Sequence, residues 1–164
     1  MTIRIAIITL SDKGAKGERE DESGKAIREM VSVIGAEINH YEILPDEQVQ
    51  IVGALVRLCD AGNIDLIITT GGTGVSPRDV TPDATRSVIE RELPGMAEAM
   101  RAESIKKTPH AMISRAVVGI RKQTLIVNLP GSPRAVRENL AVLLPALTHA
   151  VEKIKGDPAE CGRS

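Results

Sequence analysis

Short β-branched runs alternate along this chain with stretches of helical periodicity, and this alternation limits the folds open to it. Residues 3–10 form an apolar run broken only by Arg4, and 64–69 form a second run; both are typical of buried strands. Two other segments have apolar residues at the spacing of one helix face: Ile27, Met30, Val31 and Ile34 in the first, and Val52, Leu55, Val56 and Cys59 in the second. A glycine ends each segment, Gly35 and Gly62 respectively. The pattern predicts right-handed crossovers and a mostly parallel sheet with helices on both faces.

The rest of the chain extends this pattern. Further strands are expected at 36–43, 117–120 and 125–129. The last two would pair as a hairpin around 121–123 and add an antiparallel edge. Further helices are expected at 82–91 with Thr81 as its cap, at 95–105, after Pro133, and again after an interruption at Pro145, ending near Lys155. The expected fold is a single α/β domain over residues 1–155, a three-layer sandwich, with a C-terminal tail at 156–164.

Composition excludes several classes of function. Tyr41 is the only aromatic residue among 164, and 21 basic residues stand against 22 acidic ones, so the chain lacks the stacking platforms and the positive charge of nucleic-acid binders. No apolar run approaches the ~18 residues of a membrane helix, and Arg4 interrupts the apolar start, unlike a signal peptide. Cys59 and Cys161 are too few and too far apart for a disulfide framework. We expect a cytoplasmic protein that uses neither nucleic acid nor membrane.

In parallel sheets of this kind, ligands bind outside the carboxyl ends of the strands, where loops and helix N-termini meet. Four loops rich in Gly, Pro, Ser or Asp follow the expected strands, at 11–14, 45–48, 70–74 and 130–133. The predicted topology brings all four to one rim.

The strongest local signal is the glycine-rich loop Thr70, Gly71, Gly72, Thr73, Gly74. Glycine lets a backbone approach a phosphate closely, and successive free N–H groups can cradle an anion. The loop lacks the Gly-Lys-Ser/Thr of a Walker motif, and Pro77 stands at the third glycine position of the dinucleotide fingerprint. A phosphate site and a tight turn that needs positive φ both fit this loop.

Two carboxylates lie near this loop in the predicted fold. Asp79 follows the loop by five residues, where it can hold Mg²⁺ against phosphate oxygens, and Asp46 can supply a second carboxylate to the same ion. Both also have an ordinary structural explanation, because a carboxylate at a helix N-terminus contributes about 0.3–1 kcal/mol. Capping is the simpler explanation for Asp83. Arg78 fits phosphate neutralisation and plain surface exposure equally well.

Four further residues at the same rim are candidates for a polar ligand. Ser11 and Asp12 offer a hydroxyl and a carboxylate, and Gly131 and Ser132 precede a helix whose N–H groups can grip an anion. A solvated turn and a proline-stiffened turn explain the same residues. A zinc site is not expected, because the histidines are scattered without ligand spacing: His40, His110, His149.

Taken together, these motifs resemble the molybdopterin-binding family of molybdenum cofactor biosynthesis proteins. The Thr-Thr-Gly-Gly-Thr-Gly run at 69–74, joined to Arg-Asp-Val-Thr-Pro at 78–82, is the most specific part of the match. The match covers nearly the whole chain and includes Leu10-Ser11-Asp12, Leu44-Pro45-Asp46-Glu47, Leu93-Pro94-Gly95-Met96, Ser114-Arg115, Gly119-Ile120-Arg121 and residues 127–132.

The resemblance implies a homotrimer and a molybdopterin adenylyltransferase reaction, in which ATP and molybdopterin give adenylyl-molybdopterin and pyrophosphate with Mg²⁺. By similarity, Asp46 and Asp79 would be the catalytic metal carboxylates, and the loop from Thr70 to Gly74 would bind the nucleotide phosphates. Molybdopterin would contact Ser11, Asp12, Gly131 and Ser132. Metal insertion would fall to a separate protein, because the chain lacks the second domain that is fused in plant and animal relatives.

Two other functions remain open at this stage. A non-catalytic molybdopterin-binding or carrier protein of the same family would bind the pterin without transferring an adenylyl group. A nucleotide-binding regulator would use the glycine loop alone. Two metal carboxylates, Asp46 and Asp79, favour catalysis, because a pure binder does not need them.

Overall fold

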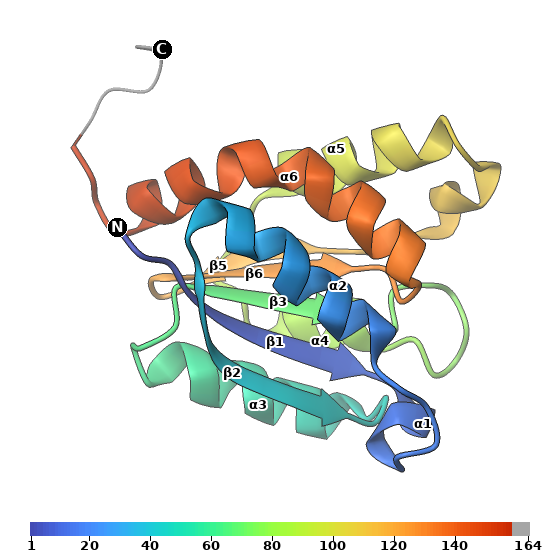
Figure 1. Cartoon of the computed structure of the whole chain (residues 1–164). Helices are drawn as coiled ribbons and strands as arrows, with labels where there is room; N and C mark the ends of the chain where they lie inside the picture. The colour runs from blue at the N-terminus through green and yellow to red at the C-terminus, as the bar shows by residue number, and fades with distance from the viewer. Residues whose placement is uncertain (159–164) are drawn as a thin grey trace.

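The computed structural model describes residues 1–158 and builds one six-stranded sheet between two layers of helices (Figure 1). The strands are β1 (Arg4–Leu10), β2 (Glu37–Leu44), β3 (Leu66–Thr70), β4 (Arg91–Glu92), β5 (Val118–Arg121) and β6 (Thr124–Leu129). The α-helices are α1 (Asp12–Ala15), α2 (Glu22–Val31), α3 (Gln48–Asp60), α4 (Thr81–Val88), α5 (Pro94–Ile105) and α6 (Pro133–Ile154). Two 3₁₀ helices, η1 (Ser32–Ile34) and η2 (Pro109–Ile113), complete the chain.

The sheet has the strand order β2-β1-β3-β6-β5-β4. The first four strands run parallel, so that Ile68 of β3 pairs with Ile7 of β1 and Val127 of β6. The hairpin of β5 and β6 is confirmed. Strand β6 belongs to the parallel part of the sheet beside β3, and β5 runs against both of its neighbours, β6 and β4. Four loops therefore leave the carboxyl ends of neighbouring parallel strands at one rim.

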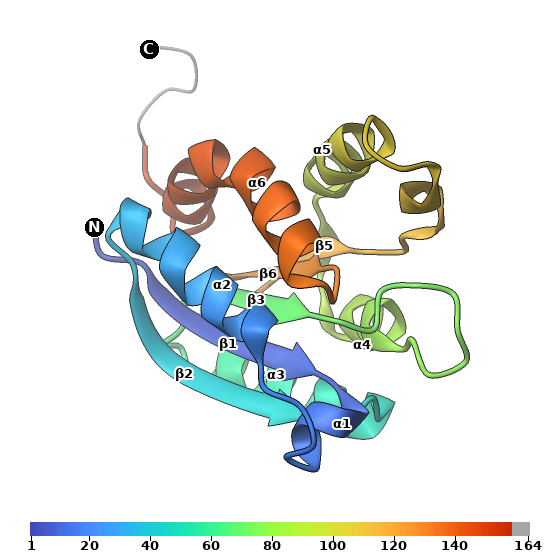
Figure 2. The ribbon, with the colours of Figure 1, turned by 45° about the vertical axis from the view of Figure 1, so that its right-hand side comes forward.

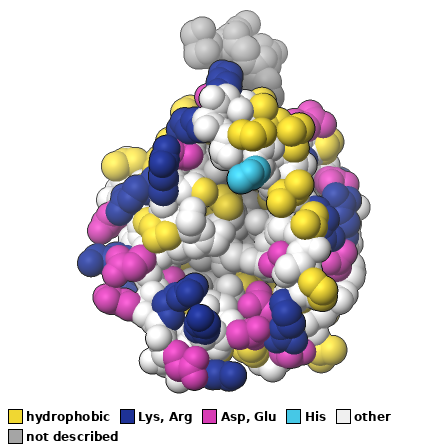
Figure 3. All heavy atoms as spheres, turned by 90° about the vertical axis from the view of Figure 1, so that its right-hand side faces the viewer, with side chains coloured by type: hydrophobic (Ala, Val, Ile, Leu, Met, Phe, Trp, Pro, Cys, Tyr) yellow, Lys and Arg dark blue, Asp and Glu magenta, His cyan; other side chains and the backbone are white. Residues whose placement is uncertain are grey.

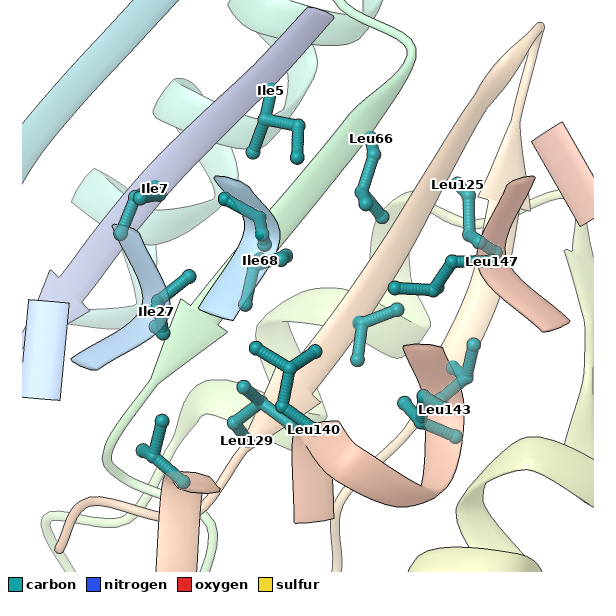
Figure 4. Packing of buried hydrophobic residues seen from close by; sticks show 14 of the residues in the cluster. Ile5, Ile7, Ile27, Leu66, Ile68, Leu125, Leu129, Leu140, Leu143 and Leu147 are labelled. Carbon is teal, nitrogen blue, oxygen red and sulfur yellow. The ribbon is translucent and has the colours of Figure 1, made fainter. Parts of the chain in front are cut away.

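The predicted three-layer α/β fold is confirmed. Alternate residues of the central strands face opposite layers, as in β1, where Ile5 and Ile7 point to one core and Ala6 and Ile8 to the other. Helices α2, α5 and α6 cover the first face, and α3 and α4 cover the second (Figures 1 and 2). Figure 4 shows the first core, in which strand residues meet Ile27 of α2 and Leu140, Leu143 and Leu147 of α6.

The structure corrects the helix expected at 82–91. Helix α4 ends at Val88, and Arg91 and Glu92 form the short edge strand β4 against β5. Backbone bonds from Glu90 to Ile120 and from Leu93 to Val118 secure it. The pairing is close: a Cβ on Gly119 would lie 2.9 Å from the carbonyl oxygen of Arg91, so β5 needs glycine there.

The structure also corrects the expected break at Pro145, because α6 runs unbroken from Pro133 to Ile154. Leu143 and Leu147 are buried on either side of the proline and hold the helix against the sheet. Pro145 has no N–H, so the carbonyl of Ala141 lacks its helical hydrogen bond. Both residues are exposed, so water can hydrogen-bond to that carbonyl. Packing of the apolar face therefore outweighs the missing hydrogen bond.

Helix α6 is followed by Lys155 and a turn at Gly156. Positions 159–164 of the expected tail, with Cys161, lie outside the described residues. Within residues 1–158, no helix is long and apolar enough to cross a membrane.

Candidate functional site at the carboxyl ends of the strands

A cavity of about 590 Å³ opens at the carboxyl ends of the parallel strands, on the face shown in Figure 3. The loops after β1, β2, β3 and β6 contribute its walls, as the topology requires. Eight of the residues predicted from the sequence line it: Ser11, Asp46, Thr70, Gly71, Gly72, Asp79, Gly131 and Ser132. Asp12, Thr73 and Gly74 do not line it.

The first half of the glycine loop has a backbone that no other residue could adopt without strain. Gly71 has a φ of 101° and Gly72 a φ of 66°. A Cβ on Gly71 would lie 2.3 Å from the carbonyl oxygen of Leu10, and one on Gly72 would lie 2.4 Å from Oγ1 of Thr81. The loop is therefore a tight turn that needs positive φ, one of the two possibilities left open by the sequence, and it lies on the cavity wall.

Thr81 fixes this loop instead of capping a helix. It is the first residue of α4, and the cap position belongs to Val80, which makes no side-chain capping bond. The Thr81 hydroxyl donates to the carbonyl oxygen of Gly71 at 2.9 Å, and its N–H donates to that of Gly72 at 3.2 Å. The predicted cap is thus a loop anchor, buried between α4 and the glycines.

The second half of the loop faces a different hollow. Thr73 and Gly74 line a neighbouring cavity of about 270 Å³, together with residues of α5, η2 and α6. Arg115 holds this half, because its backbone N–H donates to Thr73 O at 2.8 Å and its Nε to Gly74 O at 2.8 Å. The loop therefore divides two cavities.

Asp46 lies on the cavity wall and does not cap α3, whose cap position is Glu47. Asp46 and Asp12 hold one another: the Asp12 N–H donates to Oδ2 of Asp46 at 3.2 Å, and the Asp46 N–H donates to Oδ1 of Asp12 at 3.0 Å. The other oxygen of Asp46, Oδ1, lies against Gly72. Burial, followed by the charge of Asp12, raises the pKa of Asp46.

Asp79 also lines the cavity and closes its own turn, because its Oδ2 accepts the N–H of Ser76 at 2.9 Å. Arg115 also donates to the Asp79 carbonyl and forms a two-pronged ion pair with Asp83 at 3.1–3.2 Å. That pair lowers the pKa of Asp83. Asp83 therefore anchors Arg115, which is more than the simple capping expected of it.

Two serines at the rim cap helices. Ser11 accepts the N–H of Gly14 at 3.0 Å at the start of α1, and Ser132 accepts that of Ala135 at 3.2 Å at the start of α6. The N-terminus of α6 therefore faces the cavity beside Gly131, and its N–H groups favour an anion there.

The sequence reasoning missed the wall formed by the start of α2. Asp21 caps this helix through Gly24 and also accepts the hydroxyls of Thr9 and Tyr41. Ser23 donates to the carbonyl oxygen of Gly131 at 2.6 Å, which joins α2 to the loop before α6. An Asp two residues before a Ser-Gly pair, at the start of an amphipathic helix that follows the first strand, was the available signal.

Comparisons with known proteins show the family to which this chain belongs. A family model described as a probable molybdopterin-binding domain matches residues 6–149. The chain belongs to the molybdopterin-binding family. It is 45% identical over 158 residues to the molybdopterin adenylyltransferase of Helicobacter pylori J99, covering 95% of this chain and 90% of that protein. The Escherichia coli K12 molybdopterin adenylyltransferase is 43% identical over 143 residues, covering 85% and 72%.

Among solved structures, the molybdopterin biosynthesis enzyme MoaB of Thermus thermophilus superposes with a TM-score of 0.90. It is 48% identical in sequence, and the match covers 97% of this chain and all of that chain. The fold and its family are therefore the same.

In this family member, the charge of the cavity bears on metal binding. Five carboxylates (Glu20, Asp21, Glu22, Asp46, Asp79) and one cation, Arg19, line it. An anionic ligand would be repelled unless a cation accompanied it. Among residues 1–158, no three His, Cys, Asp or Glu side chains are grouped to hold a metal by themselves. Mg²⁺ is commonly held by one or two carboxylates plus substrate phosphates, and Asp46 and Asp79 fit that donor set.

Proposed function

We propose that this chain is a molybdopterin adenylyltransferase, which transfers the adenylyl group of ATP to the phosphate of molybdopterin and releases pyrophosphate. The observation that carries the proposal is one acidic cavity bounded by a phosphate-type glycine loop and by Asp46 and Asp79. The names of relatives at 43–45% identity over most of the chain support it.

The reaction is an in-line displacement at the α-phosphorus of ATP. A phosphate oxygen of molybdopterin forms the new P–O bond, and the bond from the α-phosphorus to the bridging oxygen of the β-phosphate breaks, with its electron pair leaving on pyrophosphate. The attacking oxygen is already anionic, so no strong general base is needed. Catalysis then depends on placing two anions in contact and neutralising their charge.

The chain's own residues divide this work. Thr70, Gly71 and Gly72 lie against the nucleotide phosphates, because the positive-φ turn at the two glycines places the loop backbone on the cavity wall. Ser11, Gly131 and Ser132, with the N-terminus of α6, hold the molybdopterin phosphate. Asp46 and Asp79 hold Mg²⁺, which neutralises phosphate charge when bound. Thr73 and Gly74 support the loop from its other side.

The remaining parts of the proposal follow the family resemblance. The protein acts as a cytoplasmic homotrimer, and a separate protein inserts molybdenum into the product. Its partners in catalysis are the two small-molecule substrates.

A single-turnover assay tests the function. Purified chain, molybdopterin, [α-³²P]ATP and Mg²⁺ are mixed, and the labelled adduct and pyrophosphate are followed in time. We expect stoichiometric adduct in the wild type, and a rate about 10²–10³-fold lower in Asp46→Asn and in Asp79→Asn. Tight pterin binding without adduct in the wild type would show that the chain is a carrier.

A further inference from the structure

Asp12 was predicted to contact molybdopterin, but the protein itself occupies both oxygens of its carboxylate. Oδ1 accepts the N–H of Asp46 and an Nη2 proton of Arg78 at 2.8 Å, and Oδ2 accepts Nε of Arg78 at 3.1 Å. The backbone N–H of Asp12 is also used, on Oδ2 of Asp46. Asp12 therefore does not line the cavity, and it is hydrogen-bonded to both the backbone and the side chain of Asp46.

Arg78 likewise does not line the cavity, and its guanidinium is taken up by protein carboxylates. Its guanidinium makes a two-pronged bond to Asp12 and a second ion pair to Glu47, with Nη1 at 3.0 Å from Oε1. Planar, two-pronged pairs of this kind fix orientation as well as distance. Arg78 directly precedes Asp79, in an exposed loop segment from Val75 to Arg78.

These contacts link the loops of three neighbouring strands. In the order β2-β1-β3, Asp46 follows β2, Asp12 follows β1, and Arg78 and Asp79 follow β3. Asp12 is the middle element: it bonds to the loop on one side through Asp46 and to the loop on the other side through Arg78. The loops that carry the Asp46 and Asp79 carboxylates of the cavity are thus joined through Asp12 and Arg78.

We propose that Asp12 and Arg78 are positioning residues, which set the separation of the Asp46 and Asp79 carboxylates for a divalent cation on the nucleotide phosphates. This inference rests on the function proposed above. Neither residue lines the cavity, so we place both behind the residues that would hold the cation. Outer residues that orient metal ligands typically change metal affinity 10–100-fold when they are replaced.

The exposure of the pair makes the inference testable. The side chains of Arg78 and Asp12 are 54% and 37% exposed, and ion pairs in such positions add little to global stability. Variants of either residue are therefore expected to fold. Arg86, which pairs with Glu92 outside the cavity and is similarly exposed, provides a matched control as Arg86→Gln.

The first experiment measures Mn²⁺ affinity by electron paramagnetic resonance in the presence of α,β-methylene-ATP, which cannot react. We expect Asp12→Asn and Arg78→Gln each to weaken Mn²⁺ binding about tenfold. Both substitutions break the same bridge, so the double variant should bind Mn²⁺ as tightly as the single variant with the lower affinity. Arg86→Gln keeps the wild-type affinity. Wild-type affinity in both single variants, or effects that add independently, would overturn the inference.

Arg78→Lys separates positioning from direct charge. Lysine keeps the positive charge but cannot form the planar two-pronged bond to Asp12. A positioning role predicts that Arg78→Lys is as weak as Arg78→Gln in Mn²⁺ binding, whereas Mn²⁺ affinity restored by lysine would overturn it. The adenylylation rate of each protein is measured in parallel. A wild type that neither binds Mn²⁺ with nucleotide nor forms adduct overturns the proposed function itself. An active wild type, with variants whose Mn²⁺ affinity is unchanged, overturns the positioning role alone.

Discussion

At the scale of single residues, the close approach of Gly71 to the first strand leaves no room for a side chain. Its Cβ position lies 2.3 Å from a backbone carbonyl oxygen that cannot move without displacing β1. The same position has positive φ, which adds strain for any L-residue. Gly71 is therefore required for the backbone conformation of the loop, and the same residue lines the cavity.

We expect Gly71→Ala to lower the free energy of unfolding by at least about 2–3 kcal/mol and to abolish nucleotide binding, since the loop must leave its place. Gly53→Ala is the control: Gly53 lies within α3 with open space around its Cβ position, so alanine there stabilises by about 0.5–1 kcal/mol. Urea unfolding and calorimetric titration with ATP measure both effects. A Gly71→Ala chain with wild-type stability would contradict this account of the loop.

Asp46 illustrates a residue whose charge costs the folded protein stability. Burial and the neighbouring Asp12 raise its pKa, so the ionised form is less favourable in the folded chain than in the unfolded one. The destabilisation is present at pH values above the folded pKa and disappears below the unfolded value, about 3.9.

We therefore expect Asp46→Asn to raise the Tm of the metal-free protein at pH 7.5, although it lowers the adenylylation rate. The gain should vanish as the pH falls below about 4, where the wild-type carboxyl is protonated too. Glu98→Gln, at an exposed position of α5, controls for the loss of one negative charge. Thermal unfolding over a pH series decides the matter, and a lower Tm for Asp46→Asn at pH 7.5 would refute it.

At the scale of elements, Asp65 joins β1, β3 and the end of α6 at the amino ends of the parallel strands, whereas the cavity lies at their carboxyl ends. Its side chain is only 1% exposed and accepts Nη2 and Nε of Arg4 in β1 at 2.7 and 3.0 Å, while Lys155, after α6, contacts it at 2.5 Å. Burial acts to raise the pKa of Asp65, but the hydrogen bonds from Arg4 and Lys155 outweigh it and hold the pKa well below its usual range.

Replacing Asp65 by Asn should lower the free energy of unfolding by about 2–3 kcal/mol at pH 7, less than for a fully buried pair, since Arg4 and Lys155 keep some contact with water. The contribution of Asp65 is complete above about pH 4 and is lost as the pH falls toward its lowered folded pKa. Denaturant unfolding at pH 7 and pH 3 measures it. A gap between wild type and variant that widens in acid would contradict the assignment.

At the scale of the whole molecule, several large apolar side chains are exposed near the smaller cavity. Val75, Ile105, Met112 and Ile113 are exposed, and they lie in or next to the segments around the smaller cavity. Figure 3 shows apolar side chains gathered on the hollowed face of the molecule. Clustered exposed apolar groups are typical of surfaces between chains.

We expect sedimentation equilibrium to give three times the 17.5 kDa mass of one chain, with Ile113→Asp shifting the mass toward that of the monomer. Val33→Asp, which places the same charge on the exposed η1 segment, should leave the assembly unchanged. A wild-type chain that sediments as a monomer at micromolar concentration would contradict the homotrimer.

The order of elements was readable from the residues alone, because period-2 and period-3.6 apolar patterns are local properties. The alternation of strands and helices predicted a parallel sheet. Because the loops after parallel strands meet at one rim, Asp46, Asp79 and Gly71 could be placed together from the sequence. Where local signals compete, the sequence misleads: Pro145 predicts an interruption that α6 does not have, and the helix predicted at 82–91 extends past Val88, where α4 ends.

Tertiary contacts determined the course of the chain at Pro145 and at Arg91. They also determined the hydrogen-bond partners of the polar side chains discussed above. A leucine-rich face packed on the sheet carries α6 through Pro145, and the open edge of β5 takes Arg91 and Glu92. Asp12, Thr81 and Asp83 each had a local explanation, yet their partners Arg78, Gly71 and Arg115 lie 66, 10 and 32 residues away. Sequence patterns report which face of an element is buried, whereas hydrogen-bond partners depend on distances between elements that exist only once the chain has folded.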